Sequence, residues 1–203
     1  MTDLLAEGER GAEVWRSDDW PGITAHVLDP ARDLDVLHEW VTRPHAGFWG
    51  LDGLTRDELR ETYEFVQTLP THRAYLVRVA GEPAALVQLY HAQDDPVATA
   101  YDARPGDVGV HFFRGAEVAP WRVLGPAMLA FAFAPPAVER LVAEPDVRNR
   151  AAVARTAASG FELAGEVVFD SAYGRKEAVL AFCTRERAEQ VFGAASAAAS
   201  PPR

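Results

Sequence analysis

The sequence has a single cysteine, Cys183, so neither a disulfide within the chain nor a cysteine metal cluster is possible. Lysine is equally scarce, because Lys176 is the one lysine among 20 basic residues. No apolar run approaches the roughly 20 residues that a membrane span needs, and residues 1–10 lack the apolar core of a signal peptide. We therefore expect a cytoplasmic protein in which Cys183 is a buried, inert thiol rather than a nucleophile.

Basic residues are outnumbered by acidic ones, 20 to 30, so the formal net charge is -10. That balance argues against nucleic acid and anionic membranes as partners. It leaves room for a polyanionic cofactor, which is held by local charge and by backbone N–H groups. The 203 residues, 48% hydrophobic and 25% charged, suit one globular domain, either a monomer or a homodimer. We expect an irregular lead-in over 1–22, the domain over 23–193 and a disordered Ala/Ser/Pro-rich tail over 194–203.

Apolar periodicity and turn residues predict an ordered set of helices and strands. The expected strands are 23–27, 75–79, 84–90, 108–113, 141–143, 161–169 and 177–184. The expected helices are 33–41, 56–67, 122–133, 149–158 and 185–192, and the second begins at a capping box formed by Thr55 and Glu58. This order predicts an α/β (α+β) fold with a mixed central sheet of about seven strands flanked by helices.

A candidate anion site lies between a strand and a helix, at Arg122-Val123-Leu124-Gly125-Pro126-Ala127. Glycine lets a phosphate approach the backbone, and the free N–H groups at a helix start attract anions. The same residues also suit an ordinary helix start. However, Arg122-x-x-Gly125-x-Ala127 resembles the acyl-CoA pyrophosphate loop of the GNAT superfamily, and Asn149 with residues 158–161 resembles its closing motif.

Four further segments resemble one branch of that superfamily, the siderophore hydroxylysine or hydroxyornithine N-acyltransferases. They are residues 38–40, 48–49, 101–111 and 144–149, and the whole resemblance covers about 23–184. It implies a GNAT fold, acetyl-CoA or another acyl-CoA as co-substrate, and a small-molecule amine as acceptor. The implied acceptor is the N-hydroxy-amine of a lysine, ornithine or cadaverine derivative. The residues expected to bind the cofactor are Phe113, Arg114, Arg122, Gly125, Pro126, Ala127 and Asn149.

His111 is the candidate catalytic residue. The strand period of two places it on one face with Gly109 and Phe113, and an imidazole inside a buried strand is costly unless it has a partner or a task. A core histidine bonded to a carbonyl is the alternative. The ordinary pKa of a histidine lies near neutrality and suits a general base, and the resemblance implies that role at this position.

A carboxylate near the proposed base is expected from the segment Glu144-Pro145-Asp146. Asp146 is the first candidate to orient His111 or to hold the acceptor amine, although it also suits an N-cap; Glu144 is the competitor. Phe48 and Trp49 lie in a Gly-rich segment and are expected to line the acceptor site, or else to pack in the core. Tyr101 is a further candidate at its edge. Lys176 is either a solvated lysine or a contact to a carboxylate or phosphate.

One departure from the superfamily bears on function. Many GNAT enzymes have a tyrosine general acid where this chain has Thr156. A second hypothesis is therefore an acyl-CoA-binding module without activity. A third is an acetyltransferase of aminoglycosides or other small amines, since polycations suit an acidic protein. The histidines lack metal-ligand spacing, so we expect no metal.

Overall fold

The fold is described from a computed structural model that places residues 4–171 and 174–191. The strands are β1 (Glu13–Arg16), β2 (Ile23–Val27), β3 (His72–Val79), β4 (Glu82–His91), β5 (Asp107–Arg114), β6 (Arg140–Ala143), β7 (Glu162–Ser171) and β8 (Gly174–Thr184). The α-helices are α1 (Leu34–Val41), α2 (Arg56–Val66), α3 (Trp121–Ala132) and α4 (Arg150–Ala158). Short 3-10 helices are η1 (Pro44–Trp49), η2 (Ala92–Asp94) and η3 (Pro96–Ala100). Residues 185–191 are also helical.

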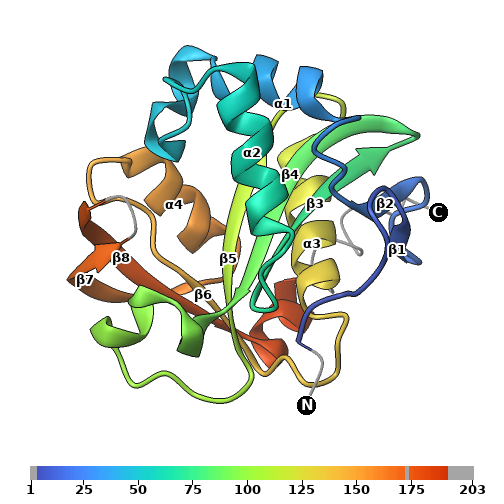
Figure 1. The fold of residues 1–203 in the computed structure, drawn as a ribbon. Helices are drawn as coiled ribbons and strands as arrows, with labels where there is room; N and C mark the ends of the chain where they lie inside the picture. Colours follow the sequence, from blue (N-terminus) through green and yellow to red (C-terminus); the bar gives the residue numbers. More distant parts are fainter. Residues whose placement is uncertain (1–3, 172–173, 192–203) are drawn as a thin grey trace.

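The eight strands that the structure describes form one sheet, in the order β1-β2-β3-β4-β5-β6-β8-β7. Neighbouring strands are antiparallel, except that β5 and β6 are parallel. Helices flank the sheet on both faces (Figure 1). The predicted mixed α/β fold is confirmed.

The N-terminal segment departs from the prediction of an irregular lead-in. β1 pairs with β2, and Leu5 is buried in the core. The strand is hard to find in the sequence because it has four residues and its pairing is interrupted by a register shift between Glu13 and Trp15. A bulge of this kind breaks the alternation that marks a strand. The predicted tail at 194–203 lies outside the described residues.

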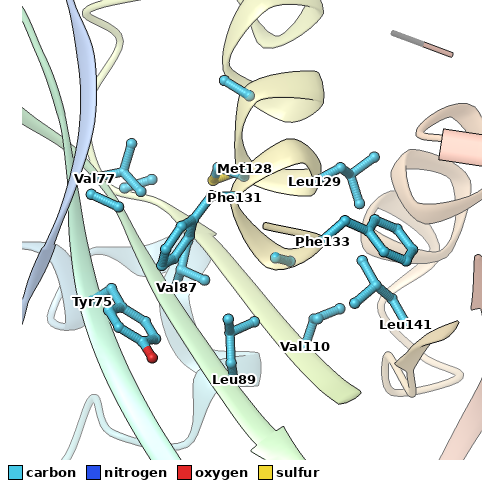
Figure 2. Packing of buried hydrophobic residues seen from close by; sticks show 14 of the residues in the cluster. Tyr75, Val77, Val87, Leu89, Val110, Met128, Leu129, Phe131, Phe133 and Leu141 are labelled. Carbon is cyan, nitrogen blue, oxygen red and sulfur yellow. The ribbon is translucent and has the colours of Figure 1, made fainter. Parts of the chain in front are cut away.

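The sheet separates two apolar layers. On one face, α3 packs against side chains from β3, β4, β5 and β6, and Figure 2 shows Met128, Leu129 and Phe131 of α3 beside them. On the other face, α1, η1 and α2 cover Leu76 and Leu86. α2 begins where the sequence predicts, because the Thr55 and Glu58 capping box is formed. The side chains of neighbouring residues in one strand thus point into opposite apolar layers, as expected for a pleated strand.

The parallel pair β5 and β6 creates the feature that positions the site. The two strands pair over three residues only, Asp107 to Gly109 with Arg140 to Val142. The pairing is fixed by the buried Asp107, whose oxygens accept from Arg140 at 2.8 and 2.6 Å. Beyond Gly109, β5 continues beside β4 while β6 ends beside β8. The strands therefore separate towards the segment of β5 that carries His111.

Candidate functional site

His111, Glu144 and Lys176 meet where β5 and β6 separate. His111 lies on β5, Glu144 directly follows β6, and Lys176 lies on β8. The Glu144 Oε1 atom is 2.6 Å from His111 Nε2 and accepts a hydrogen bond from Lys176 Nζ at 3.0 Å. The carboxylate is buried, with 4% of its side chain exposed, whereas 39% of the His111 side chain is exposed. One buried anion thus holds an accessible imidazole and an ammonium group.

The charge state of Glu144 follows from these contacts. Burial by itself raises the pKa of a carboxyl group. The charge and hydrogen bond of His111, followed by those of Lys176, outweigh burial and lower the Glu144 pKa to about 2. Glu144 is therefore ionised at neutral pH, and as a carboxylate it can only accept hydrogen bonds. In the neutral imidazole the proton then belongs on Nε2, which leaves the His111 Nδ1 lone pair free to act as a base.

Aromatic rings surround the imidazole. The Trp49 ring meets His111 edge-on, with centroids 5.9 Å apart, and the Tyr90 ring lies 5.3 Å away. Tyr90 fits because residue 109 is glycine, since a Cβ there would lie 2.0 Å from the tyrosine ring. Burial, and next the charge of Glu144, raises the pKa of the Tyr90 hydroxyl well above its ordinary value. Tyr90 is a site residue that the sequence analysis missed, because Gly109 meets Tyr90 only through the pairing of β5 with β4.

The two candidate carboxylates have different partners. Asp146 accepts from Arg148 Nε and Nη2 at 2.9 and 2.7 Å, and this hydrogen bonding is the main cause of its lowered pKa. The partner of His111 is Glu144, so the expected preference for Asp146 as the residue that orients His111 does not fit the structure. Asp146 is not the N-cap of α4 either. That position is Asn149, whose side chain accepts from the Ala152 N–H.

Tyr101 contacts the first residue of β5 rather than His111 itself. Its hydroxyl donates to Asp107 Oδ2 at 3.1 Å, and its ring packs 5.2 Å from that of Phe182. Asp107 begins β5, four residues before His111, and Tyr101 also packs against the apolar cluster that contains Tyr90. Its expected place at the edge of the acceptor site therefore stays a prediction. By contrast, Trp49 lies beside His111, and its neighbour Phe48 is 53% exposed on η1.

The start of α3 suits an anion, although not in the way that the Gly125 motif suggests. Pro120 is the N-cap without a side-chain hydrogen bond, and no acidic residue occupies the first turn. The free N–H groups of a helix belong to its first residues, here Trp121 and the exposed Arg122. Gly125 lies one turn further on, and a Cβ there would lie 3.1 Å from the Trp121 ring.

A groove of about 180 Å³ adjoins this helix start. It is lined by Trp121, Arg122, Pro126, Leu129, Ala158, Ser159 and Val191. The groove brings together the first turn of α3, Pro126 and the end of α4, which are the segments that resemble the cofactor motifs. Ala127 is buried in the core beneath it.

The remaining candidate cofactor residues lie at the end of β5. Phe113 is buried against Trp49, with ring centroids 5.1 Å apart. Arg114 donates to the Ala119 carbonyl at 2.9 Å and so fixes the connection that leads to α3. Cys183 is buried, and burial raises its pKa to about 12, which fits an inert thiol. None of the described helices has the length and apolar character to cross a membrane.

Comparisons with known proteins agree with this geometry. Residues 29–169 match the acetyltransferase (GNAT) domain family. The chain is 32% identical over 143 residues to the lysine N-acyltransferase MbtK of Mycolicibacterium paratuberculosis, an alignment that covers 66% of this chain and 63% of that relative. It is 26% identical to N-hydroxyputrescine acetyltransferase of Acinetobacter baumannii, over 80% of this chain and 77% of that one.

A solved structure of AAC(6′)-Ib in complex with paromomycin and acetyl-CoA matches with a TM-score of 0.69. That match has 25% identity and covers 83% of this chain and 97% of the other. The family match, over residues 29–169, covers more than half of the chain. The chain therefore belongs to the GNAT family of acetyltransferases.

Proposed function

We propose that this protein is an acyl-CoA-dependent N-acyltransferase that acylates the N-hydroxy-amine of a lysine, ornithine or cadaverine derivative in hydroxamate siderophore biosynthesis. One observation carries the proposal: His111 is accessible where β5 and β6 diverge, and a buried, ionised Glu144 orients it. An acyl-CoA supplies a thioester, which is already activated towards an amine. The acceptor nitrogen attacks the thioester carbonyl, the C–S bond breaks, and coenzyme A leaves as a thiolate that takes up one proton, equal to the one released by the nitrogen.

The proposed role of His111 as a base follows from its tautomer. Glu144 holds the Nε2 proton, so Nδ1 accepts a proton from the acceptor nitrogen, and the imidazolium that results is stabilised by the carboxylate. Lys176 donates to the same Glu144 oxygen and helps to keep the carboxylate ionised. Asp146 and Thr156 need no part in these steps.

The donor would be held by groups that the chain already presents. The first-turn N–H groups of α3 and the guanidinium of Arg122 fit a diphosphate. Beyond Gly109, β5 has no pairing with β6 in the described residues, so the backbone near Phe112 to Arg114 is available to the acyl arm. Binding at these two places would present the acyl group beside His111.

The choice of acceptor draws on the relatives. Two of them are named for acylation of lysine and of N-hydroxyputrescine. A hydroxylamine nitrogen is less basic than an alkyl amine and is largely neutral at pH 7. It needs no deprotonation before it attacks, so the base has to accept only the proton that the nitrogen loses during the reaction. Trp49 and the exposed Phe48 offer apolar surface for the methylene chain of such an acceptor.

The test is a turnover assay with acetyl-, succinyl- and malonyl-CoA against N6-hydroxylysine, N5-hydroxyornithine and N-hydroxycadaverine. We expect turnover of at least one pair and a fall in kcat of about 100-fold or more in His111→Ala. The control is His26→Ala, which should keep its activity because β2 is separated from β5 by β3 and β4. Lack of turnover with every pair would refute the proposal. Calorimetric binding of CoA without turnover would favour the binding module instead.

An aminoglycoside acetyltransferase is the second candidate. The likeness to AAC(6′)-Ib and the net charge of -10 favour it. Kanamycin in the same assay separates the two functions, since a kcat/KM for kanamycin above that for every N-hydroxy-amine would select the aminoglycoside.

A further inference from the structure

Gln88 is a polar exception in the middle of an apolar strand. From Ala84 to Tyr90 every residue of β4 is buried except Gln88, which is partly exposed. It lies directly opposite His111 in the β4–β5 register. In the described part of the chain, its side-chain amide makes no hydrogen bond to another residue. The strand therefore carries one unused amide, and that amide adjoins the proposed base.

Register fixes where this amide is presented. Directly opposed residues of an antiparallel pair point to the same face, with Cβ atoms about 4.5–5.5 Å apart. Gln88 and His111 therefore share a face, with Tyr90 next along β4. An amide at a half-buried position loses hydrogen bonds to water and is costly unless something replaces them. An apolar residue would pack there without that cost, so packing does not account for the glutamine.

The chemistry of the acceptor supplies a use for the amide. A hydroxylamine has an N–OH group, which both donates and accepts a hydrogen bond, and the glutamine amide does the same through its NH₂ and C=O. A primary amine has no atom at the position of this hydroxyl. If the acceptor nitrogen donates a hydrogen bond to His111, its hydroxyl oxygen is one covalent bond from that nitrogen. The hydroxyl is then within reach of side chains that share the face of His111.

We propose that Gln88 hydrogen-bonds the hydroxyl of the acceptor and so makes the enzyme select N-hydroxy-amines over the corresponding amines. This inference rests on the proposed function and adds a residue that determines specificity. A site built to bind a substrate hydroxyl discriminates strongly against the analogue that lacks it, because its polar group is then left unpaired.

The test compares N-hydroxycadaverine with cadaverine as acceptors at saturating acyl-CoA. In Gln88→Met, which keeps the side-chain length but removes the hydrogen bonds, the ratio of the two kcat/KM values should fall by about 10- to 100-fold relative to the unsubstituted enzyme. The difference in basicity between the acceptors cancels, because it is the same for both enzymes. Gln93→Met is the matched control, since Gln93 is exposed on η2 and bonds the Ala103 carbonyl.

The outcomes separate the two proposals. If the unsubstituted enzyme acylates no N-hydroxy-amine, the proposed function fails. If it acylates N-hydroxycadaverine but Gln88→Met leaves the ratio within twofold, the role of Gln88 is refuted. Should Gln88→Met not fold, Gln88→Asn decides: it keeps the amide but withdraws it by one methylene, so the ratio should fall by about 10-fold, and an unchanged ratio again overturns the inference.

Discussion

Replacing Lys176 with methionine tests whether the buried carboxylate of Glu144 depends on two cations. The substitution keeps the aliphatic part of the side chain but removes the ammonium group, which is 3.0 Å from Glu144 Oε1. His111 then remains bonded to Glu144 Oε1 at 2.6 Å. Because Glu144 is only 4% exposed, water cannot replace the lost hydrogen bond.

The size of the effect follows from the lowered pKa of Glu144. The difference between about 2 and the ordinary value of 4.5 corresponds to roughly 3 kcal/mol of stabilisation of the carboxylate while both His111 and Lys176 are cationic. His111 makes the larger contribution and Lys176 the smaller one. We therefore expect Lys176→Met to lower the free energy of unfolding by about 1–2 kcal/mol at pH 7.

The assay is urea unfolding of Lys176→Met, Glu144→Gln and the double variant between pH 7 and pH 3. The double variant should cost less than the sum of the two single changes, with a coupling free energy of about 1–2 kcal/mol. A carboxylate with a depressed pKa stabilises the fold above the unfolded-state value and loses that effect as pH falls through the folded one. The loss in Lys176→Met should thus be complete at pH 7 and shrink as the pH falls from about 4.5 towards 2.

Arg175→Met is the matched control, because Arg175 precedes Lys176 on β8, is exposed, and forms no ion pair within residues 4–171 and 174–191. Its stability should change by less than about 0.5 kcal/mol. The reasoning fails if the two variants lose equal stability, or if the two single changes at Glu144 and Lys176 are additive.

Three further predictions test other parts of the structure. Gly109→Ala should lower the unfolding free energy by about 2–3 kcal/mol in urea, because its Cβ would overlap the Tyr90 ring; unchanged stability would contradict that contact. Tyr101→Phe should cost about 1 kcal/mol of stability through its lost bond to Asp107 and leave kcat/KM within about twofold, whereas a tenfold rise in the acceptor KM would place Tyr101 at the acceptor site. Arg122→Ala should raise the KM for acyl-CoA about fivefold with little change in kcat, and an unchanged KM would exclude an anion at this helix start.

Elements set by local chemistry were predictable from the sequence. The capping box at Thr55 fixes the start of α2, and the tight turn before Glu82 joins β3 to β4. The register between β4 and β5 was not predictable, because a long connection with two 3-10 turns separates them. For that reason the contacts of His111 with Tyr90, and its position opposite Gln88, emerge only from the structure.

The choice between the two carboxylates shows the same limit. Glu144 and Asp146 are two residues apart, so an extended chain sends both side chains to the same face, about 6.5 Å from each other. Arg148 binds Asp146 locally, while Glu144 lies where the imidazole can reach it. The segment was identified from the sequence, but which carboxylate meets His111 depends on where β6 ends.

The short pairing of β5 with β6 has a consequence for association. Unsatisfied strand backbone at the rim of a sheet invites a neighbouring molecule to add a strand. Here the unmatched stretch lies in the interior of the sheet order, with β4 on one side and β6 and β8 on the other. A strand from another protein molecule therefore has little room to enter. A slender, extended small molecule with amide groups can instead hydrogen-bond the free backbone of β5, and the gap does not promote polymerisation of the protein.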